Sequence, residues 1–208
     1  MSGRRLTTAE AKVEVAAAVR QIESLTSAEV VVAVRPHSGH YRHTDWLVGS
    51  LFAFVALLVF LFWPVDFSID WMPLESLIAF GTGAALSANL PALRRMFTSR
   101  RLMQSNLQTS ARAAFVDLNI ARTSARTGML VYVSLFEAGA EAVLDIGIDR
   151  VPLEPALGSA LAALNAAVRK SEQLSSFVQA LRALGPVLAS TLPRRSDDIN
   201  ELPDEPPA

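Results

Sequence analysis

The sequence contains no cysteine. This absence excludes disulfide bonds, thiolate metal sites and cysteine nucleophiles, and it is compatible with the cytoplasm. The chain also lacks an excess of charge of either sign, because its formal net charge is −1 over 208 residues. No overall electrostatic field attracts nucleic acid, and we therefore expect no nucleic-acid partner.

Signals for secretion and for nucleotide binding are missing as well. Residues 1–15 include two arginines but no continuous apolar run after them, so we expect no secretory leader there. The sequence has no P-loop and no internal repeat. The first apolar stretch long enough to cross a membrane lies well inside the chain.

That stretch covers residues 47–63 and has no charged side chain. As a helix it would be about 25 Å long, slightly short of a bilayer core of about 30 Å. Its leucine, valine and phenylalanine residues contribute about −4 to −7 kcal/mol to insertion, which is enough for insertion without a partner. A buried globular helix would show a polar stripe, and this segment has only Gly49 and Ser50. We predict a transmembrane helix.

A second, weaker segment covers residues 73–93. Pro73 suits the first turn of a helix, where its missing N–H is not needed. The strongly apolar residues of this segment contribute only about −2 to −4 kcal/mol. Beside the first segment, however, it completes a two-helix hairpin. All three tryptophans fall at the predicted boundaries, as membrane-interface residues do: Trp46, Trp63 and Trp71.

The distribution of basic residues predicts the orientation of this hairpin. The linker at residues 64–72 has no lysine or arginine, whereas arginines lie on both outer flanks. By the positive-inside rule, we expect a two-pass protein of the inner (cell) membrane with both termini in the cytoplasm. The flanking arginines are Arg35, Arg42, Arg94, Arg95, Arg100, Arg101 and Arg112.

The flanking segments predict one small α/β (α+β) sandwich, with a small central sheet between helices, that the hairpin interrupts. Neither flank has enough apolar surface to fold alone, so strand 29–35 should join the same sheet as strand 129–137. The other predicted elements are a helix from Thr7 or Thr8 to about Leu25, a helix at 98–123, a strand at 141–146, and helices around 157–168 and 174–188. The expected division is residues 1–46, the hairpin 47–93, residues 94–192, and a disordered acidic tail 193–208.

Several short motifs, taken in order, resemble the TPM domain family in its bacterial membrane-anchored branch, which has a transmembrane hairpin inserted in the domain. The resemblance covers most of the chain. Its motifs are Thr26-Ser27-Ala28-Glu29, Ser38-Gly39 with Tyr41-Arg42, Arg126-Thr127-Gly128, Asp145-x-Gly147-Ile148 and Asn200-Glu201-Leu202-Pro203-Asp204.

The resemblance implies an αβα sandwich attached to a membrane, in a family linked to the upkeep of membrane complexes. Some members are described as phosphatases or as binding calcium. This sequence departs from the family pattern at Ala138 and Gly139, where basic residues are common, and it lacks a tryptophan near Leu157. We carry over no catalytic residue.

Two groups of residues are candidates for metal binding. His37, His40 and His43 are the only histidines and lie at steps of three, so they could bind zinc or nickel if one surface gathered them. The alternative is a solvated loop, because Pro36 and Gly39 oppose the helix that would align them. Glu137, Glu141 and Asp145 could hold calcium or another divalent metal at the strand ends. The alternative is that they are surface carboxylates without a ligand.

No catalytic constellation accompanies the predicted anchor. We therefore expect a non-enzymatic, membrane-anchored adaptor or maintenance factor, without a cofactor, whose partners are the lipid bilayer and other membrane proteins. The pattern leaves a homo-oligomer open. The competing hypothesis is a metal-dependent phosphatase at the cytoplasmic face of the membrane, which rests on the family resemblance and on the carboxylates near Asp145.

Overall fold

The fold is α+β, with many helices and one small mixed sheet. The structure is a computed structural model, and it describes residues 6–64, 68–169, 174–195 and 200–202. The chain forms two compact units. We call Met1–Ser38 with Gln104–Ala208 the α+β unit, and Gly39–Met103 the hairpin unit.

The sheet of the α+β unit joins strands from both sides of the hairpin. Its strands are β1 (Glu29–Arg35), β2 (Gly128–Ser134) and β3 (Gly139–Leu144), in the order β1-β2-β3. β1 runs parallel to β2, with Glu29 opposite Gly128 and Arg35 opposite Ser134, and β3 runs antiparallel to β2. This confirms the prediction that the first strand and the strand near residue 130 share a sheet. Parallel strands need a long connection, and the hairpin unit lies in that connection.

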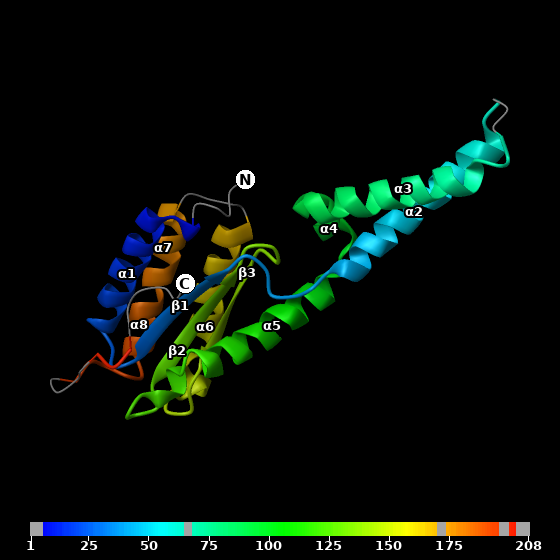
Figure 1. The fold of residues 1–208 in the computed structure, drawn as a ribbon. Helices are drawn as coiled ribbons and strands as arrows, with labels where there is room; N and C mark the ends of the chain where they lie inside the picture. Colours follow the sequence, from blue (N-terminus) through cyan, green and yellow to red (C-terminus); the bar gives the residue numbers. More distant parts are fainter. Residues whose placement is uncertain (1–5, 65–67, 170–173, 196–199, 203–208) are drawn as a thin grey trace. The chain divides into compact units, whose positions relative to one another are not determined.

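Helices cover both faces of this sheet (Figure 1). The bounds of the helices are α1 Ala9–Glu23, α5 Arg100–Asp117, the 3₁₀ helix η2 Ile120–Arg122, α6 Arg150–Arg169, α7 Leu174–Arg182 and α8 Leu184–Ala189. Thr8 caps α1 by accepting a hydrogen bond from Ala11 N at 3.2 Å, as its sequence position predicts. The predicted helix 98–123 instead ends at Asp117, because Asn119 adopts a left-handed conformation (φ 56°).

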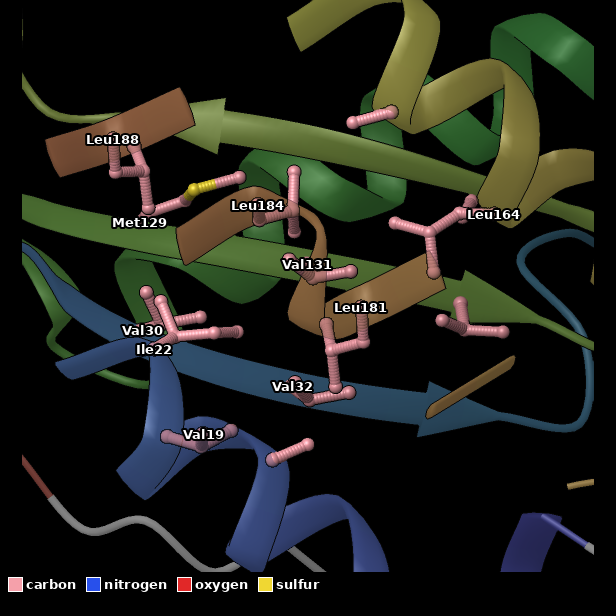
Figure 2. Close-up of a cluster of buried hydrophobic side chains, with 14 of the residues drawn as sticks. Val19, Ile22, Val30, Val32, Met129, Val131, Leu164, Leu181, Leu184 and Leu188 are labelled. Atoms are coloured by element: carbon pink, nitrogen blue, oxygen red, sulfur yellow. The ribbon is translucent and has the colours of Figure 1, made fainter. Parts of the chain in front are cut away.

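Alternation along the strands divides the interior into two cores. Val30, Val32, Met129 and Val131 face the core that α1, α6, α7 and α8 cover, and Figure 2 shows these side chains meeting those of the helices. The residues between them face the second core, where they pack against side chains of α5 and η2. These residues are Val31, Ala33, Leu130 and Tyr132. Successive side chains of a strand point to opposite faces, so a strand buried on both faces is apolar throughout.

The second strand is shorter than the sequence predicts, and the third has the predicted length but begins and ends two residues earlier. β2 ends at Ser134 rather than at Glu137, and β3 begins at Gly139 and ends at Leu144. The turn between them covers residues 135–138, and Ala138 has a positive φ of 51° there. The strand direction therefore reverses before Glu137 can extend β2.

The predicted disordered tail, 193–208, falls partly outside the described residues. Of its described part, Glu201 accepts hydrogen bonds from Ser124 N and Ser124 Oγ at 2.8 and 2.5 Å. These bonds lower the pKa of the Glu201 carboxyl. Leu202 packs against the second core. The described part of this segment therefore contacts the α+β unit, and the disorder of 193–208 stays a prediction.

The hairpin unit consists of α2 (Arg42–Phe62), α3 (Met72–Asn89) and the short α4 (Pro91–Phe97). α2 begins five residues before the predicted start at residue 47. The predicted second segment, 73–93, is not one straight helix, because α3 ends at Asn89 and the axis turns by 105° into α4. Leu90 at the bend has φ −111° and ψ 94°. A residue before proline is pushed out of the helical region, and Pro91 follows it.

Close backbone packing joins α2 and α3 at two glycines. A Cβ atom on Gly49 would lie 2.8 Å from Phe80 O, and one on Gly83 would lie 2.7 Å from Phe52 Cγ. The Trp46 ring also meets Phe80 edge-on, with ring centroids 6.4 Å apart. Small residues that allow such an approach are typical of helix pairs in membranes.

Candidate functional site

The surface of α2 is the first functional feature of the hairpin unit. α2 has 21 residues and is long and apolar enough to cross a membrane. Within the described residues, α6 is the other single helix that qualifies, and α3 with α4 qualifies only as a bent pair. Large apolar side chains of α2 are exposed: Leu47, Leu51, Phe52, Phe54, Val55, Leu57, Leu58, Val59, Leu61 and Phe62.

α6 differs from α2 in its surroundings. Its apolar face packs into the first core, through Leu153, Leu157 and Leu164. The opposite side of the helix has exposed polar and small residues, such as Glu154 and Ser159. Such an amphipathic pattern belongs to a helix that packs on one face, and we assign α6 to the domain core.

A polar network closes the base of the hairpin. Arg94 of α4 donates two hydrogen bonds to the Asp45 carboxylate of α2, from Nε to Oδ1 at 2.9 Å and from Nη2 to Oδ2 at 2.7 Å. Ser87 Oγ of α3 donates a third, at 2.7 Å. Asp45 and Ser87 are buried. The network therefore ties together all three helices of this unit.

A second contact reinforces this base. Thr44 Oγ1 lies 3.1 Å from Thr98 Oγ1, and Thr98 Oγ1 in turn donates to Arg94 O at 2.7 Å. Both threonines are buried. The beginning of α2 and the end of α4 are thus joined through side chains as well as through the ion pair.

The α+β unit contains a polar hollow along β3. Its volume is about 180 Å³. It is lined by Gln108 and Arg112 of α5, by residues 141–145, and by Ile148 and Arg150. Arg112 and Arg150 are exposed, whereas residues 141–144 are half-buried. The hollow thus combines cationic side chains with part of a strand.

Glu141 is the carboxylate inside this hollow. Burial raises the pKa of Glu141, and the nearby positive charges of Arg150 and Arg112 act in the opposite direction. Burial is the largest of these influences. The two guanidinium groups therefore only partly compensate the lost hydration of this carboxylate.

The other two carboxylates of the predicted metal group lie apart from Glu141. Glu137 accepts hydrogen bonds from Ser38 N, at 2.9 Å, and from Ser134 Oγ, and so lies beyond the end of β2. Asp145 pairs with the other end of β2, through a bond from Asp145 N to Gly128 O at 2.9 Å. Four residues of strand, about 13 Å, separate Asp145 from Glu141.

Asp145 already has a cationic partner. It is buried, and Arg126 binds it with Nη2 3.0 Å from Oδ1 and Nε 3.0 Å from Oδ2. Asp145 Oδ1 also accepts a hydrogen bond from Ile146 N at 2.8 Å. The carboxylate therefore acts as a structural anchor for the turn after β3. The predicted site of Glu137, Glu141 and Asp145 gains no support from this arrangement.

The three histidines are distributed over both units. His37 belongs to the α+β unit, and His40 and His43 belong to the hairpin unit. The His43 ring lies 6.4 Å from the Tyr41 ring, and His43 Nε2 is 3.3 Å from Thr44 Oγ1. In the part of the chain that the structure describes, no three His, Asp or Glu side chains are arranged to hold a metal ion.

Sequence reasoning missed the base network and the hollow. Asp45 lies just before the predicted hairpin and Arg94 just after it. In an antiparallel hairpin both positions lie at the same end, so their opposite charges could have indicated an ion pair there. The hollow had no such signal, because its side chains come from α5, β3 and the start of α6.

Comparison with known proteins adds information on the fold. No family model and no curated protein matches the chain. The chain is similar to the NMR structure of the BA42 protein from the psychrophilic bacterium Bizionia argentinensis. The TM-score is 0.57 at 17% sequence identity, and the match covers 96% of this chain and 92% of that one. At this identity the likeness concerns the fold alone.

Proposed function

We propose that this chain is a two-pass membrane protein of the TPM family type, whose α+β domain is a cytoplasmic adaptor for other membrane proteins. The observation that carries the proposal is the exposed apolar surface of α2. In water, so large an uncovered patch would cause aggregation, whereas in a bilayer it faces lipid. The TPM assignment rests on the order of the short sequence motifs.

The bend between α3 and α4 supports the same placement. If α3 crosses the bilayer, a turn of 105° lets α4 lie nearly parallel to the membrane surface. Met96 and Arg95 of α4 are exposed, a combination that suits the headgroup region. Arg94 meanwhile turns inward to Asp45. The base of the hairpin then lies at the cytoplasmic interface, on the side where the arginines favour it.

The adaptor role is favoured over a phosphatase because two of the three predicted metal-binding carboxylates already have partners within the protein. Asp145 is paired with Arg126, and Glu137 is held by Ser38 and Ser134. Glu141 lies in the hollow with Arg112 and Arg150, and Arg150 also pairs with Glu154 at 3.6 Å. These groups provide structure and a polar surface rather than a shared cation site.

Cysteine labelling tests the topology without background, because the chain has no native cysteine. Ser68→Cys lies in the linker and Ser159→Cys on the exposed side of α6. With a membrane-impermeant thiol reagent, we expect Ser68→Cys to react in intact cells and Ser159→Cys to react only in inverted membrane vesicles. The reverse pattern would move the domain to the outer face. Failure of Ser159→Cys to react in either preparation would show that α6 crosses the membrane.

Site-specific cross-linking tests the adaptor role. A photoreactive residue in place of Gln108, in the hollow, should capture integral membrane proteins in native membranes. The matched control replaces Ser175, which is exposed on α7. If both positions capture the same set, or if position 108 captures only soluble proteins, the adaptor role is wrong.

A further inference from the structure

The base of the hairpin unit has an excess of positive charge. This base comprises residues 39–46 and 87–103, which contain five arginines and one acidic residue, Asp45. Arg94 neutralises Asp45 in its ion pair. The opposite end of the hairpin differs, because residues 64–75 contain acidic residues and no lysine or arginine. The positive charge of this unit is therefore concentrated at one end.

Three arginines of the base take no part in ion pairs of the protein. Arg42, Arg100 and Arg101 are exposed, and none of them forms an ion pair with another described residue. Arg95 is exposed as well, but it has a contact within the protein. The charges of the first three guanidinium groups therefore remain available to a ligand.

Side-chain contacts bring these three arginines to the same end of the hairpin. The hydroxyl oxygens of Thr44 and Thr98 lie 3.1 Å apart and join the start of α2 to the end of α4. Arg42 precedes Thr44 by two residues, and Arg100 follows Thr98 by two. The Cα atom of each arginine therefore lies within about 7 Å of the Cα atom of its threonine. Arg101 is the next residue of the chain, so the three positions form one cationic surface.

The neighbouring aromatic side chain indicates the depth of this surface in a bilayer. Trp46 is 64% exposed and lies one helical turn, about 6 Å along α2, from Arg42. Indole rings favour the headgroup level of a membrane. In a bilayer that holds Trp46 at that level, the apolar surface of α2 lies on one side of the ring. Arg42 lies on the other side, among the lipid phosphates.

We propose that the base of the hairpin binds anionic phospholipid headgroups through Arg42, Arg100 and Arg101. The guanidinium groups donate hydrogen bonds to phosphate oxygens, whose geometry matches their planar arrangement of N–H groups. Phosphatidylcholine carries its own positive charge next to the phosphate, whereas phosphatidylglycerol does not. The anionic lipid therefore gains more from the same contact. This lipid binding rests on the membrane placement of the proposed function and not on the adaptor role.

A lipid suits this surface better than a soluble anion does. Exposed apolar side chains of the same unit lie close to the arginines in the sequence, namely Trp46 and Leu47 on α2 and Met96 on α4. A phospholipid contacts both kinds of side chain, with its headgroup and with its acyl chains. Free phosphate contacts the arginines alone. A site that prefers free phosphate is therefore an outcome that would overturn the proposal.

The test measures which lipid surrounds each end of α2 in vesicles that contain the full chain. Phosphatidylcholine with brominated acyl chains quenches a tryptophan that it contacts, and an unbrominated lipid that displaces it relieves the quenching. Trp63→Phe/Trp71→Phe leaves Trp46, at the base, as the one tryptophan. The matched control, Trp46→Phe/Trp71→Phe, leaves Trp63 at the other end of α2.

We expect unbrominated phosphatidylglycerol to displace the quencher from Trp46 with an affinity at least about fivefold above that of unbrominated phosphatidylcholine. One basic residue near an anionic surface contributes about that factor. Trp63 should show no such preference. Sodium chloride at about 1 M, where the screening length is about 3 Å, should remove most of the preference at Trp46.

Arginine variants locate the site. Arg42→Gln/Arg100→Gln/Arg101→Gln should give the two lipids about equal affinity at Trp46, and lysine at the three positions should keep part of the preference because the charge remains. If the glutamine variant does not insert, the salt titration of the native arginines still tests the same charges. The matched control removes three exposed arginines from the α+β unit and should leave the preference unchanged: Arg122→Gln/Arg169→Gln/Arg182→Gln.

The outcomes separate lipid binding from the proposed function. Equal affinities of the two lipids at Trp46, or an undiminished preference in the glutamine variant, overturn lipid binding at the base. A preference that inorganic phosphate abolishes, but chloride of equal ionic strength does not, overturns it as well. If brominated lipid does not quench Trp46 at all, the membrane placement fails and lipid binding fails with it. If the preference is found but position 108 captures no membrane protein, only the adaptor role fails.

Discussion

Replacement of Arg94 by methionine should destabilise the hairpin unit strongly. The change removes two charge-assisted hydrogen bonds to Asp45 and leaves Ser87, among the described residues, as the one remaining donor to that carboxylate. The side chains of Asp45 and Arg94 are only 12% and 26% exposed, so water replaces the lost bonds incompletely. Removal of one partner from a buried pair costs about 3–5 kcal/mol. Because Arg94 is a quarter exposed, we expect the lower end, about 3 kcal/mol.

The double variant Asp45→Leu/Arg94→Met provides the internal check. Removal of both charges leaves no unpaired buried charge, and only the buried Ser87 hydroxyl loses its acceptor, so this variant should be destabilised by about 1–2 kcal/mol, less than Arg94→Met alone. The two single changes should then be coupled by at least about 2 kcal/mol. The matched control is Arg101→Met, which removes an exposed arginine from the same unit.

The assay is unfolding of the full chain in mixed micelles with rising SDS fraction, followed by tryptophan fluorescence. All three tryptophans lie in the hairpin unit, so the signal reports on that unit. The expected result is a large shift of the midpoint for Arg94→Met and a small one for Arg101→Met. Equal shifts for these two, or single changes that add without coupling, would refute the assignment of a buried ion pair.

Two further predictions concern helix packing and pH. Gly83→Ala should destabilise the hairpin by about 1–3 kcal/mol in the same SDS titration, because the new methyl group overlaps Phe52. The control is Gly81→Ala, whose methyl group meets nothing within 4 Å. Gly81→Ala should leave the midpoint of the titration unchanged. Since burial raises the pKa of Glu141, the contribution of this group to stability is fully present below its ordinary pKa of 4.5 and is lost as the pH rises through the raised value. Glu141→Gln should therefore gain melting temperature relative to the native chain as the pH rises from 4.5 toward neutrality, and a constant difference across that range would contradict it.

Local sequence patterns were sufficient to predict the helices and strands that form because of their own amino-acid composition. The run Glu29–Arg35 is β-branched and apolar, and it forms β1 with those same bounds. Residues 47–63 lack charge and form most of α2. The pairing of β1 with β2 also followed from the sequence, because neither flank has enough apolar surface to fold alone. The mixed α+β architecture is a consequence of these elements.

Helix and strand ends required more than the apolar pattern. The segment 73–93 is mostly apolar and reads as one helix, yet the steric effect of Pro91 on Leu90 divides it into α3 and α4. Likewise Glu137 continues the strand pattern of β2, but the turn at Ala138 excludes it from the sheet. In both places a local conformational restriction prevailed over hydrophobic periodicity.

The candidate sites depended on the tertiary structure. Asp45 and Arg94 are 49 residues apart in the chain, and only the antiparallel packing of α2 and α3 with the bend into α4 brings them within 2.7 Å. The hollow forms because β3 is an edge strand that passes beside α5, which no local pattern specifies. Thus composition and periodicity determined which segments form apolar helices and strands, since those properties act between neighbours in the sequence. The polar contacts and the open strand edge were decided by tertiary packing, because they depend on which distant segments meet.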